Sequence, residues 1–229
     1  MPTKTCTVRK YGIFPYADAW EMQKQLVQSI QKGEATDALI LLEHPPVFTI
    51  GKSGKDANLL IDKNVLDKVG AEVFHVDRGG DITYHGPGQL VGYPIMNLRK
   101  YKCDIKWYIN RIEEVLIRTV AHYGIEAGRI KGLTGVWVGD NKIAAIGARI
   151  SKWITSHGFA LNVNTDLDYF RLIVPCGIRD KGVTSMSKIL GNSVDIEDVK
   201  DRVTAEFGET FGCKMTQESL LVKDEGKDR

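Results

Sequence analysis

A chain of 229 residues, 43% hydrophobic and 26% charged, has the composition of a globular protein rather than a disordered or fibrous one. Its net charge of +2 is too small, and its basic residues too dispersed, to indicate a nucleic-acid-binding protein. Met1–Lys10 is polar with no apolar run behind it, and no stretch approaches the roughly 18 apolar residues of a membrane span. We therefore expect a cytoplasmic protein with no membrane association.

The first half of the sequence predicts a mixture of strands and helices. Apolar residues in Ala17–Gln31 recur at near-helical spacing, and Gly33 follows as a helix stop. Ala38–Leu42 is an uninterrupted apolar run, which is typical of a buried strand. The other elements predicted here are strands at Thr5–Tyr11, Val47–Ile50, Glu72–Asp77 and Gln89–Met96, and a short helix at Val65–Val69.

The second half contains the clearest helix, Ile105–Tyr123, whose apolar residues form one stripe at steps of three or four. Asp104 is its candidate N-cap and Gly124 its candidate end. The mixture of helices with antiparallel strands favours an α+β fold, a mixed or antiparallel sheet flanked by helices. The remaining predictions are strands at Gly135–Val138, Lys142–Ser151 and Gly158–Val163, turns at Gly139–Asn141 and near Thr155–His157, and a helix at Asp195–Phe211.

A glycine-rich segment, Arg78–Gln89, stands out between two predicted strands. Glycine allows a backbone to approach a ligand closely, and exposed N–H groups can then donate to it. The alternative is a long structural turn in which His85 acts as a cap. Long loops usually have a function, so the segment is a candidate binding loop.

The four cysteines are scattered, with no C-x-x-C pair, and we expect free thiols rather than zinc ligands or disulfides. Cys176 lies between Pro175 and Gly177, which leaves its thiol uncrowded. A thiolate is nucleophilic, and a thioester formed on it is open to attack by an amine. Most cysteines are small buried apolar residues, and this reading stays open for Cys176 when it is considered alone.

Lys142 begins a predicted strand that otherwise consists of small and apolar residues. An ammonium next to a thiol lowers the thiol pKa, and a lysine in a dry site can move protons. The alternative is a solvated lysine at a hairpin end. Likewise, the small residues of Ala144–Ala148 and Gly158–Ala160 fit either a pocket for an alkyl chain or close strand packing.

Gly51-Lys52-Ser53 matches only the end of a phosphate-binding loop, because Pro46 stands where the motif needs glycine. No G-x-G-x-x-G opens a helix either, so the sequence contains no nucleotide-binding fingerprint.

Taken together, six segments resemble the lipoyl(octanoyl) transferases of lipoate biosynthesis, in family order over roughly residues 40–190. The loop and the Pro-Cys-Gly segment are the specific matches. The segments are R-G-G-D-I-T-Y-H-G-P-G-Q-L at 78–90, G-V-W-V at 135–138, K-I-A-A-I-G-A-R-I at 142–150, G-F-A-L-N-V at 158–163, V-P-C-G-I at 174–178 and G-V-T-S at 182–185.

The resemblance implies the fold shared by biotin protein ligases and lipoate ligases, related to class II aminoacyl-tRNA synthetases. It implies one acyltransferase domain over 1–213, with a main body at 1–180, a smaller part at 181–213 and a polar tail at 214–229. Cys176 would carry the acyl thioester, and Lys142 would lower its pKa and act as acid and base. The implied substrate-binding residues are Arg78, Gly79, Gly80, Asp81, Ile82, Thr83, Tyr84, His85, Ala145, Ile146, Gly147, Gly158, Phe159 and Ala160.

The implied donor is octanoyl-acyl carrier protein, and the implied acceptor is a lysine on the lipoyl domain of a 2-oxoacid dehydrogenase E2 subunit or on the glycine cleavage H protein. No ATP, metal or other cofactor is expected, and the chain is expected to be a monomer. Two alternatives stay open at this stage: an ATP-dependent lipoate or biotin ligase on the same fold, and a non-catalytic module that binds lipoyl domains.

Overall fold

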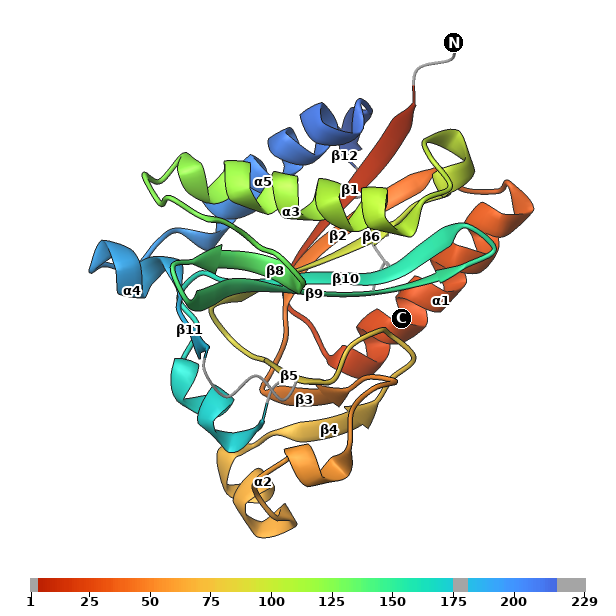
Figure 1. Cartoon of the computed structure of the whole chain (residues 1–229). Helices are drawn as coiled ribbons and strands as arrows, with labels where there is room; N and C mark the ends of the chain where they lie inside the picture. Colours follow the sequence, from red (N-terminus) through yellow and green to blue (C-terminus); the bar gives the residue numbers. More distant parts are fainter. Residues whose placement is uncertain (1–3, 175–180, 218–229) are drawn as a thin grey trace, which may run out of the picture.

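Two β-sheets organise the chain in the computed structural model, which describes residues 4–174 and 181–217 (Figure 1). The larger sheet is mixed, with the order β12-β1-β2-β6-β10-β9-β8-β7, and β11 pairs with β9 beside this path. Its strands are β1 (Thr5–Ile13), β2 (Asp37–Glu43), β6 (Gln89–Ile95), β7 (Gly128–Ile130), β8 (Leu133–Val138), β9 (Asn141–Ser151), β10 (Ile154–Asn162), β11 (Gly182–Val183) and β12 (Lys214–Gln217). The smaller sheet has the order β4-β3-β5, from β3 (Val47–Ile50), β4 (Glu72–His75) and β5 (Ile82–His85).

Helices cover both faces of the larger sheet. Figure 1 shows α3 (Ile105–Ala121) and α5 (Ile196–Phe211) above it, and α1 (Tyr16–Lys32) and the smaller sheet below it. No helix in the described part of the chain is both long and apolar enough to span a membrane. The shorter helical segments are α2 (Lys63–Val69), α4 (Met186–Leu190) and the 3₁₀ turns Asp56–Asn58, Leu98–Lys100 and Leu167–Leu172.

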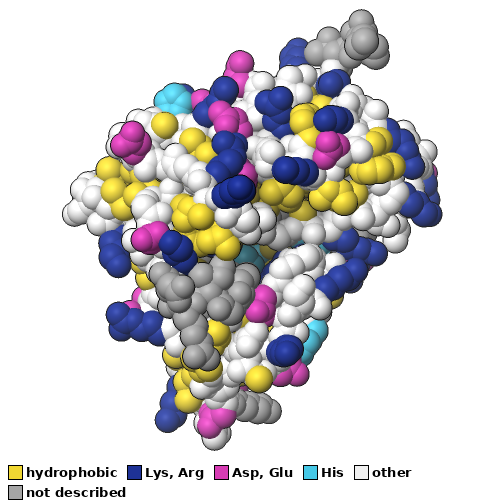
Figure 2. All heavy atoms as spheres, viewed as in Figure 1, with side chains coloured by type: hydrophobic (Ala, Val, Ile, Leu, Met, Phe, Trp, Pro, Cys, Tyr) yellow, Lys and Arg dark blue, Asp and Glu magenta, His cyan; other side chains and the backbone are white. Residues whose placement is uncertain are grey.

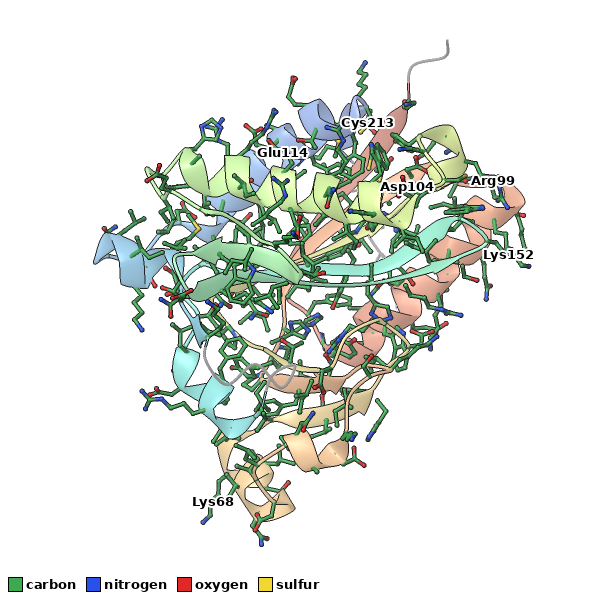
Figure 3. All side chains as sticks on the ribbon, in the orientation of Figure 1. Lys68, Arg99, Asp104, Glu114, Lys152 and Cys213 are labelled. Atoms are coloured by element: carbon green, nitrogen blue, oxygen red, sulfur yellow. The ribbon has the colours of Figure 1, made fainter. Side chains whose placement is uncertain are left out.

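Local sequence signals set the ends of the long helices. Gly33 follows α1 with a φ of 79°, a left-handed conformation that glycine adopts without steric cost. The Asp104 carboxylate accepts a hydrogen bond from the Trp107 N–H, so Asp104 caps α3 as predicted (Figure 3). The C-cap of α3 is His122, two residues before the predicted end at Gly124.

The strand β2 shows why an uninterrupted apolar run was a good signal, because both faces of the larger sheet are buried. Leu39 and Leu41 join the core between the sheet and helices α3 and α5, whereas Ile40 and Leu42 join the core between the sheet and α1. The observed fold therefore confirms the α+β prediction, with a mixed sheet between helices.

Two local predictions are wrong. The strand β5 lies inside the segment predicted as a continuous loop. The turn expected near Thr155–His157 instead falls at Lys152 and Trp153, whose φ values are 51° and 65°, and Ile154–Asn162 is all strand. Left-handed turn positions usually hold glycine or asparagine, so neither residue signalled the turn. β7, β11, α4 and β12 were not predicted either; β12 begins the expected polar tail and pairs in parallel with β1.

Candidate active site

A cavity of about 470 Å³ is lined by β9, β10 and the loop that leads into β5, and it also reaches β8 and Ile109 of α3. Figure 2 shows the surface hollowed between the upper and lower layers, with hydrophobic side chains above the hollow. The cavity brings together all the predicted site residues within the described chain except Tyr84. Those that line it are Arg78, Gly79, Gly80, Asp81, Ile82, Thr83, His85, Lys142, Ala145, Ile146, Gly147, Gly158, Phe159 and Ala160.

Small residues of β9 and β10 form the sheet side of this cavity. Ala145 pairs with Ala160, and Gly147 pairs with Gly158. A Cβ at Gly147 would lie 3.0 Å from the Gly79 carbonyl oxygen, and one at Gly158 would lie 2.2 Å from the Gly92 oxygen. Glycine at 147 therefore lets the loop approach β9, whereas glycine at 158 is required by packing within the sheet.

Backbone hydrogen bonds hold the loop Arg78–Asp81 against both sheets. On one side Gly51, Lys52 and Ser53 donate to the carbonyl oxygens of Asp81, Arg78 and Gly80 at 3.0–3.2 Å. On the other side Gly79 donates to the Ala148 carbonyl oxygen at 3.0 Å. The N–H groups of Gly51-Lys52-Ser53 thus position the loop by hydrogen bonds to its carbonyl oxygens, and this agrees with the prediction that the segment is not a phosphate-binding loop.

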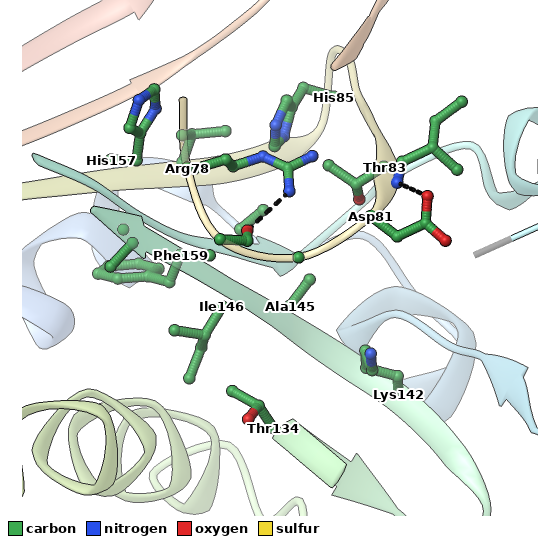
Figure 4. A pocket seen from close by; sticks show the side chains of 18 of the residues that line it. Arg78, Asp81, Thr83, His85, Thr134, Lys142, Ala145, Ile146, His157 and Phe159 are labelled. Atoms are coloured by element: carbon green, nitrogen blue, oxygen red, sulfur yellow. Dashed lines mark hydrogen bonds between the residues drawn. The ribbon is translucent and has the colours of Figure 1, made fainter. Parts of the chain in front are cut away.

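Arg78 is a buried part of this loop, with only 7% of its surface exposed. Its Nη2 donates to the carbonyl oxygen of Thr49 at 2.7 Å and to the Thr49 hydroxyl at 2.9 Å. Its Nη1 donates to the Gly79 oxygen at 3.1 Å, which Figure 4 shows as a dashed line. The guanidinium therefore fixes the loop from inside while lining the cavity.

The strand β5 divides its side chains between two environments. Tyr84 points away from the cavity, where its ring stacks on Tyr169 and contacts Phe48. Thr83 and His85 face the cavity, as the period of two in a strand requires. The role predicted for Tyr84 in binding stays a prediction, and its observed contacts are with other aromatic side chains.

His85 is held in one tautomer. The Gln89 amide donates through Nε2 to the Tyr84 carbonyl and to Asn162, so its Oε1 must accept from His85 Nδ1, 2.8 Å away. Burial lowers the pKa of His85 to about 3, assisted by the charge of nearby His44. The imidazole is therefore neutral near pH 7, with Nε2 as a hydrogen-bond acceptor.

A second buried histidine supports the same wall. His44 Nδ1 lies 2.7 Å from the Phe14 carbonyl oxygen and Nε2 lies 2.7 Å from the Tyr93 hydroxyl. The carbonyl can only accept, so Nδ1 carries the proton and Nε2 accepts from Tyr93. Burial lowers the pKa of His44 to about 4. Tyr16 packs on both rings, so three aromatic rings lie together at this end of the cavity.

His157 and Asp77 close the cavity near the beginning of the loop. His157 Nε2 lies 2.8 Å from an Asp77 oxygen, and Arg149 forms an ion pair with the same carboxylate. Burial lowers the pKa of His157 despite the opposing effect of Asp77. Burial pushes the pKa of Asp77 upward, but the hydrogen bond and charge of His157 and the charge of Arg149 hold it below its usual value.

Lys142 lies at the other side of the cavity from His157 (Figure 4). Its strand pairs with β8 on one side, and Val183 of β11 pairs with Lys142 itself. Its Nζ lies 4.8 Å from the centroid of the Trp137 ring. Cys176 lies outside the described residues, so its distance from Lys142 stays untested. Among the described cysteines, Cys6, Cys103 and Cys213 are free thiols, as predicted.

Several lining residues were not predicted. They include Tyr16, Val91, Tyr93, Trp137 and Lys181–Val183. Val91 and Tyr93 alternate on β6, which is a usable signal for one face of a strand. Every residue of β6 is buried, however, so the sequence could not show which face borders a cavity.

The class of protein follows first from the fold. A putative lipoate protein ligase from T. acidophilum with bound lipoic acid superposes with a TM-score of 0.71 at 17% identity, covering 94% of this chain and 89% of that one. Biotin protein ligase from Aquifex aeolicus, in its apo form, gives a TM-score of 0.52 at 13% identity, covering 91% and 69%. The chain therefore has the fold of lipoate ligases and biotin protein ligases.

The family follows from sequence. Residues 15–208 match the lipoyl protein ligase A/B catalytic domain, and the chain belongs to this family. It is 52% identical to an octanoyltransferase from Solibacter usitatus, over 96% of this chain and 99% of that one. It is 50% identical to an octanoyltransferase from Thermoanaerobacter sp., over 96% and 97%. The activity is octanoyl transfer in protein lipoylation, which makes the chain an acyltransferase.

Proposed function

We propose that the octanoyl group comes from acyl carrier protein, is held as a thioester on Cys176 and passes to a lysine of a lipoyl domain or of the glycine cleavage H protein. The supporting observation is the cavity itself: an apolar space bordered by alanines and glycines, with Lys142 at one side. Lys181, five positions after Cys176 in the chain, also borders this cavity.

The first half-reaction exchanges one thioester for another. The Cys176 thiolate attacks the donor carbonyl, forms a new carbon–sulfur bond and expels the thiolate of the carrier's pantetheine arm. Lys142 takes the proton of Cys176 and gives it to the departing thiolate. Because a thioester replaces a thioester, this step is close to neutral in free energy.

The second half-reaction forms an amide. The neutral amine of the acceptor lysine attacks the thioester carbonyl, the carbon–sulfur bond breaks, and the proton lost by the amine returns through Lys142 to the Cys176 sulfur. Amide formation from a thioester is downhill, so neither ATP nor a metal is required. We propose accordingly that the enzyme uses no cofactor beyond the carrier-bound donor.

The tetrahedral oxyanion needs hydrogen-bond donors. Gly79 donates to the Ala148 oxygen, so the backbone groups of Ala148, and of Ile146 two residues earlier, point away from β10. Those of Gly147 point toward β10. We therefore propose the Ile146 N–H as the donor from β9, alongside the N–H groups of Cys176 and Gly177.

The test is an incubation of the protein with octanoyl-acyl carrier protein, with and without an apo lipoyl domain, and without ATP. Mass spectrometry should find octanoyl on Cys176 when the acceptor is absent, and on the acceptor lysine when it is present. Cys176→Ser should abolish nearly all turnover. Cys103→Ala is the matched control, because the exposed thiol of Cys103 reports non-specific acyl exchange.

Three outcomes would overturn the proposal. Turnover that requires ATP would indicate a ligase instead. Turnover that survives Cys176→Ser would remove the thioester intermediate. Binding of the lipoyl domain without any gain in its mass would indicate a non-catalytic module.

A further inference from the structure

The contact between Lys142 and Trp137 joins the proposed acid–base residue to a buried aromatic ring. Trp137 on β8 stands opposite Lys142 on β9 in the strand register. The ammonium nitrogen lies 4.8 Å from the ring centroid, within the range of a cation–π interaction. Trp137 is only 3% exposed, and both residues border the cavity.

The methylene groups of the Lys142 side chain are in close contact with the backbone, in addition to the contact of its ammonium group with Trp137. A Cβ at Gly135 would lie 3.4 Å from Lys142 Cε and 3.5 Å from Cδ, so the glycine backbone packs directly against the stem. The φ of Gly135 is 127°, and an added Cβ would also lie 2.7 Å from the Ala144 oxygen. Glycine is therefore required here, and its backbone and the Trp137 ring together restrict the conformation of the lysine side chain.

The charged groups near the cavity that the structure describes form hydrogen bonds and ion pairs of their own. Glu113, from α3, accepts from the Gly135 N–H at 3.1 Å and from Arg129 at 2.9 Å. Lys181, next to β11, forms an ion pair with Asp140. From the loop, Arg78 donates to Thr49, and Asp81 accepts from the side chain of Asn58 and the N–H of Ile82.

We propose that Trp137 is a positioning residue for octanoyl transfer: its ring face holds the Lys142 ammonium beside the cavity and stabilises the charged form. The inference rests on the proposed function, in which that ammonium serves the Cys176 thiolate. The negative face of the ring quadrupole attracts an ammonium and has no such attraction for a neutral amine. Trp137 thereby favours the thiolate–ammonium pair over the neutral pair.

Two substitutions separate the ring face from packing. Trp137→Phe keeps a π face, whereas Trp137→Leu keeps only apolar bulk. The indole Nε1 has no hydrogen-bond partner among the described residues, so neither change removes a hydrogen bond found there. We expect Trp137→Leu to slow acylation of Cys176 by about tenfold and Trp137→Phe by less than about threefold.

The pH dependence of kcat/KM for the donor gives the decisive readout. Losing the ring makes the ammonium easier to deprotonate, so the basic limb should move to lower pH. Without the ring the ammonium is also held less closely to Cys176 and stabilises its thiolate less, so the acidic limb should move to higher pH. The bell-shaped pH profile of kcat/KM should therefore become narrower on both sides in Trp137→Leu and keep nearly its original width in Trp137→Phe.

Trp107→Leu is the matched control, because Trp107 packs against Phe211 on the opposite face of the sheet. Trp107→Leu should lower Tm without changing the width of the pH profile of kcat/KM. A Trp137→Leu profile of unchanged width, or equal losses in the Leu and Phe variants, would overturn the inference. Failure of the proposed function is distinguishable, because Cys176→Ser and Lys142→Ala would then retain turnover.

Discussion

The two faces of β10 lie in opposite environments although their residues alternate along one strand. Leu161 packs with α3 and α5 in the larger core and is fully buried. Ala160, its neighbour, faces the other side and borders the cavity. The space around Leu161 is filled and the space around Ala160 is left partly open, because the two side chains differ in size although both are apolar. In this fold, the residues with small side chains on an apolar strand mark the place where a ligand can enter.

The first test of this comparison removes a large side chain from the well-packed core on the Leu161 side of β10. Leu161→Ala should destabilise the protein by about 2–5 kcal/mol, because the surrounding helices cannot fully close the cavity it leaves. Urea unfolding measures the loss, and octanoyl transfer by the folded fraction should change little. Ile105→Ala is the control: Ile105 is 56% exposed, so its removal should cost less than about 0.5 kcal/mol. Equal losses in the two variants would contradict the assignment of the core.

The second test uses pH, because the two regions also differ in titratable groups. His44 and His85 support the cavity with pKa values lowered by burial to about 4 and about 3. A histidine whose folded pKa is depressed takes up protons in the unfolded state first, below its usual value near 6.5. Stability is therefore fully present above that value and falls as the pH is lowered, by about 2 kcal/mol per histidine between pH 7 and pH 5.

Urea unfolding at pH 7 and pH 5 checks this expectation. His44→Gln should reduce the difference between the free energies of unfolding measured at these two pH values. His122→Gln is the control on the helical side, because the His122 side chain is exposed to solvent rather than buried. The carboxyl of Asp77, whose pKa is lowered from 3.8, loses its contribution only at more acidic pH and does not confuse the result. A flat profile between pH 7 and pH 5 would exclude buried neutral histidines.

The third test, with the smallest expected effect, places a larger side chain in the cavity at position 160. Ala160→Leu should lower kcat/KM for an octanoyl donor by about tenfold, because the larger side chain occupies space that the acyl chain needs. A butyryl donor needs less of the cavity and should be affected by less than about twofold. The ratio of the two values corrects for any loss of folded protein. An equal reduction for both donors would mean that the acyl chain does not pass Ala160.

The sequence predicted well those elements whose signals are local. The helix α3 was predicted from its apolar stripe, and Asp104 caps it through one hydrogen bond. The strand β3 has the predicted limits, Val47–Ile50. The glycine-rich loop and the small residues of β9 and β10 were also recognised, because unusual composition is visible without a fold. Prediction failed where the signal is tertiary: β5 is a strand because it pairs with β3, and Lys152 and Trp153 turn because β9 must pair with β10.

The amino-acid sequence alone determined the long helices, the buried strands, the family resemblance and the candidate site residues. Only the tertiary structure decided that Trp137 lies beneath the Lys142 ammonium, that Tyr84 faces away from the cavity, and that Val91 and Tyr93 border it. These facts depend on which strands are neighbours and on which face of each strand meets open space. Contacts between residues far apart in the chain arise from packing, and one-dimensional spacing does not contain them.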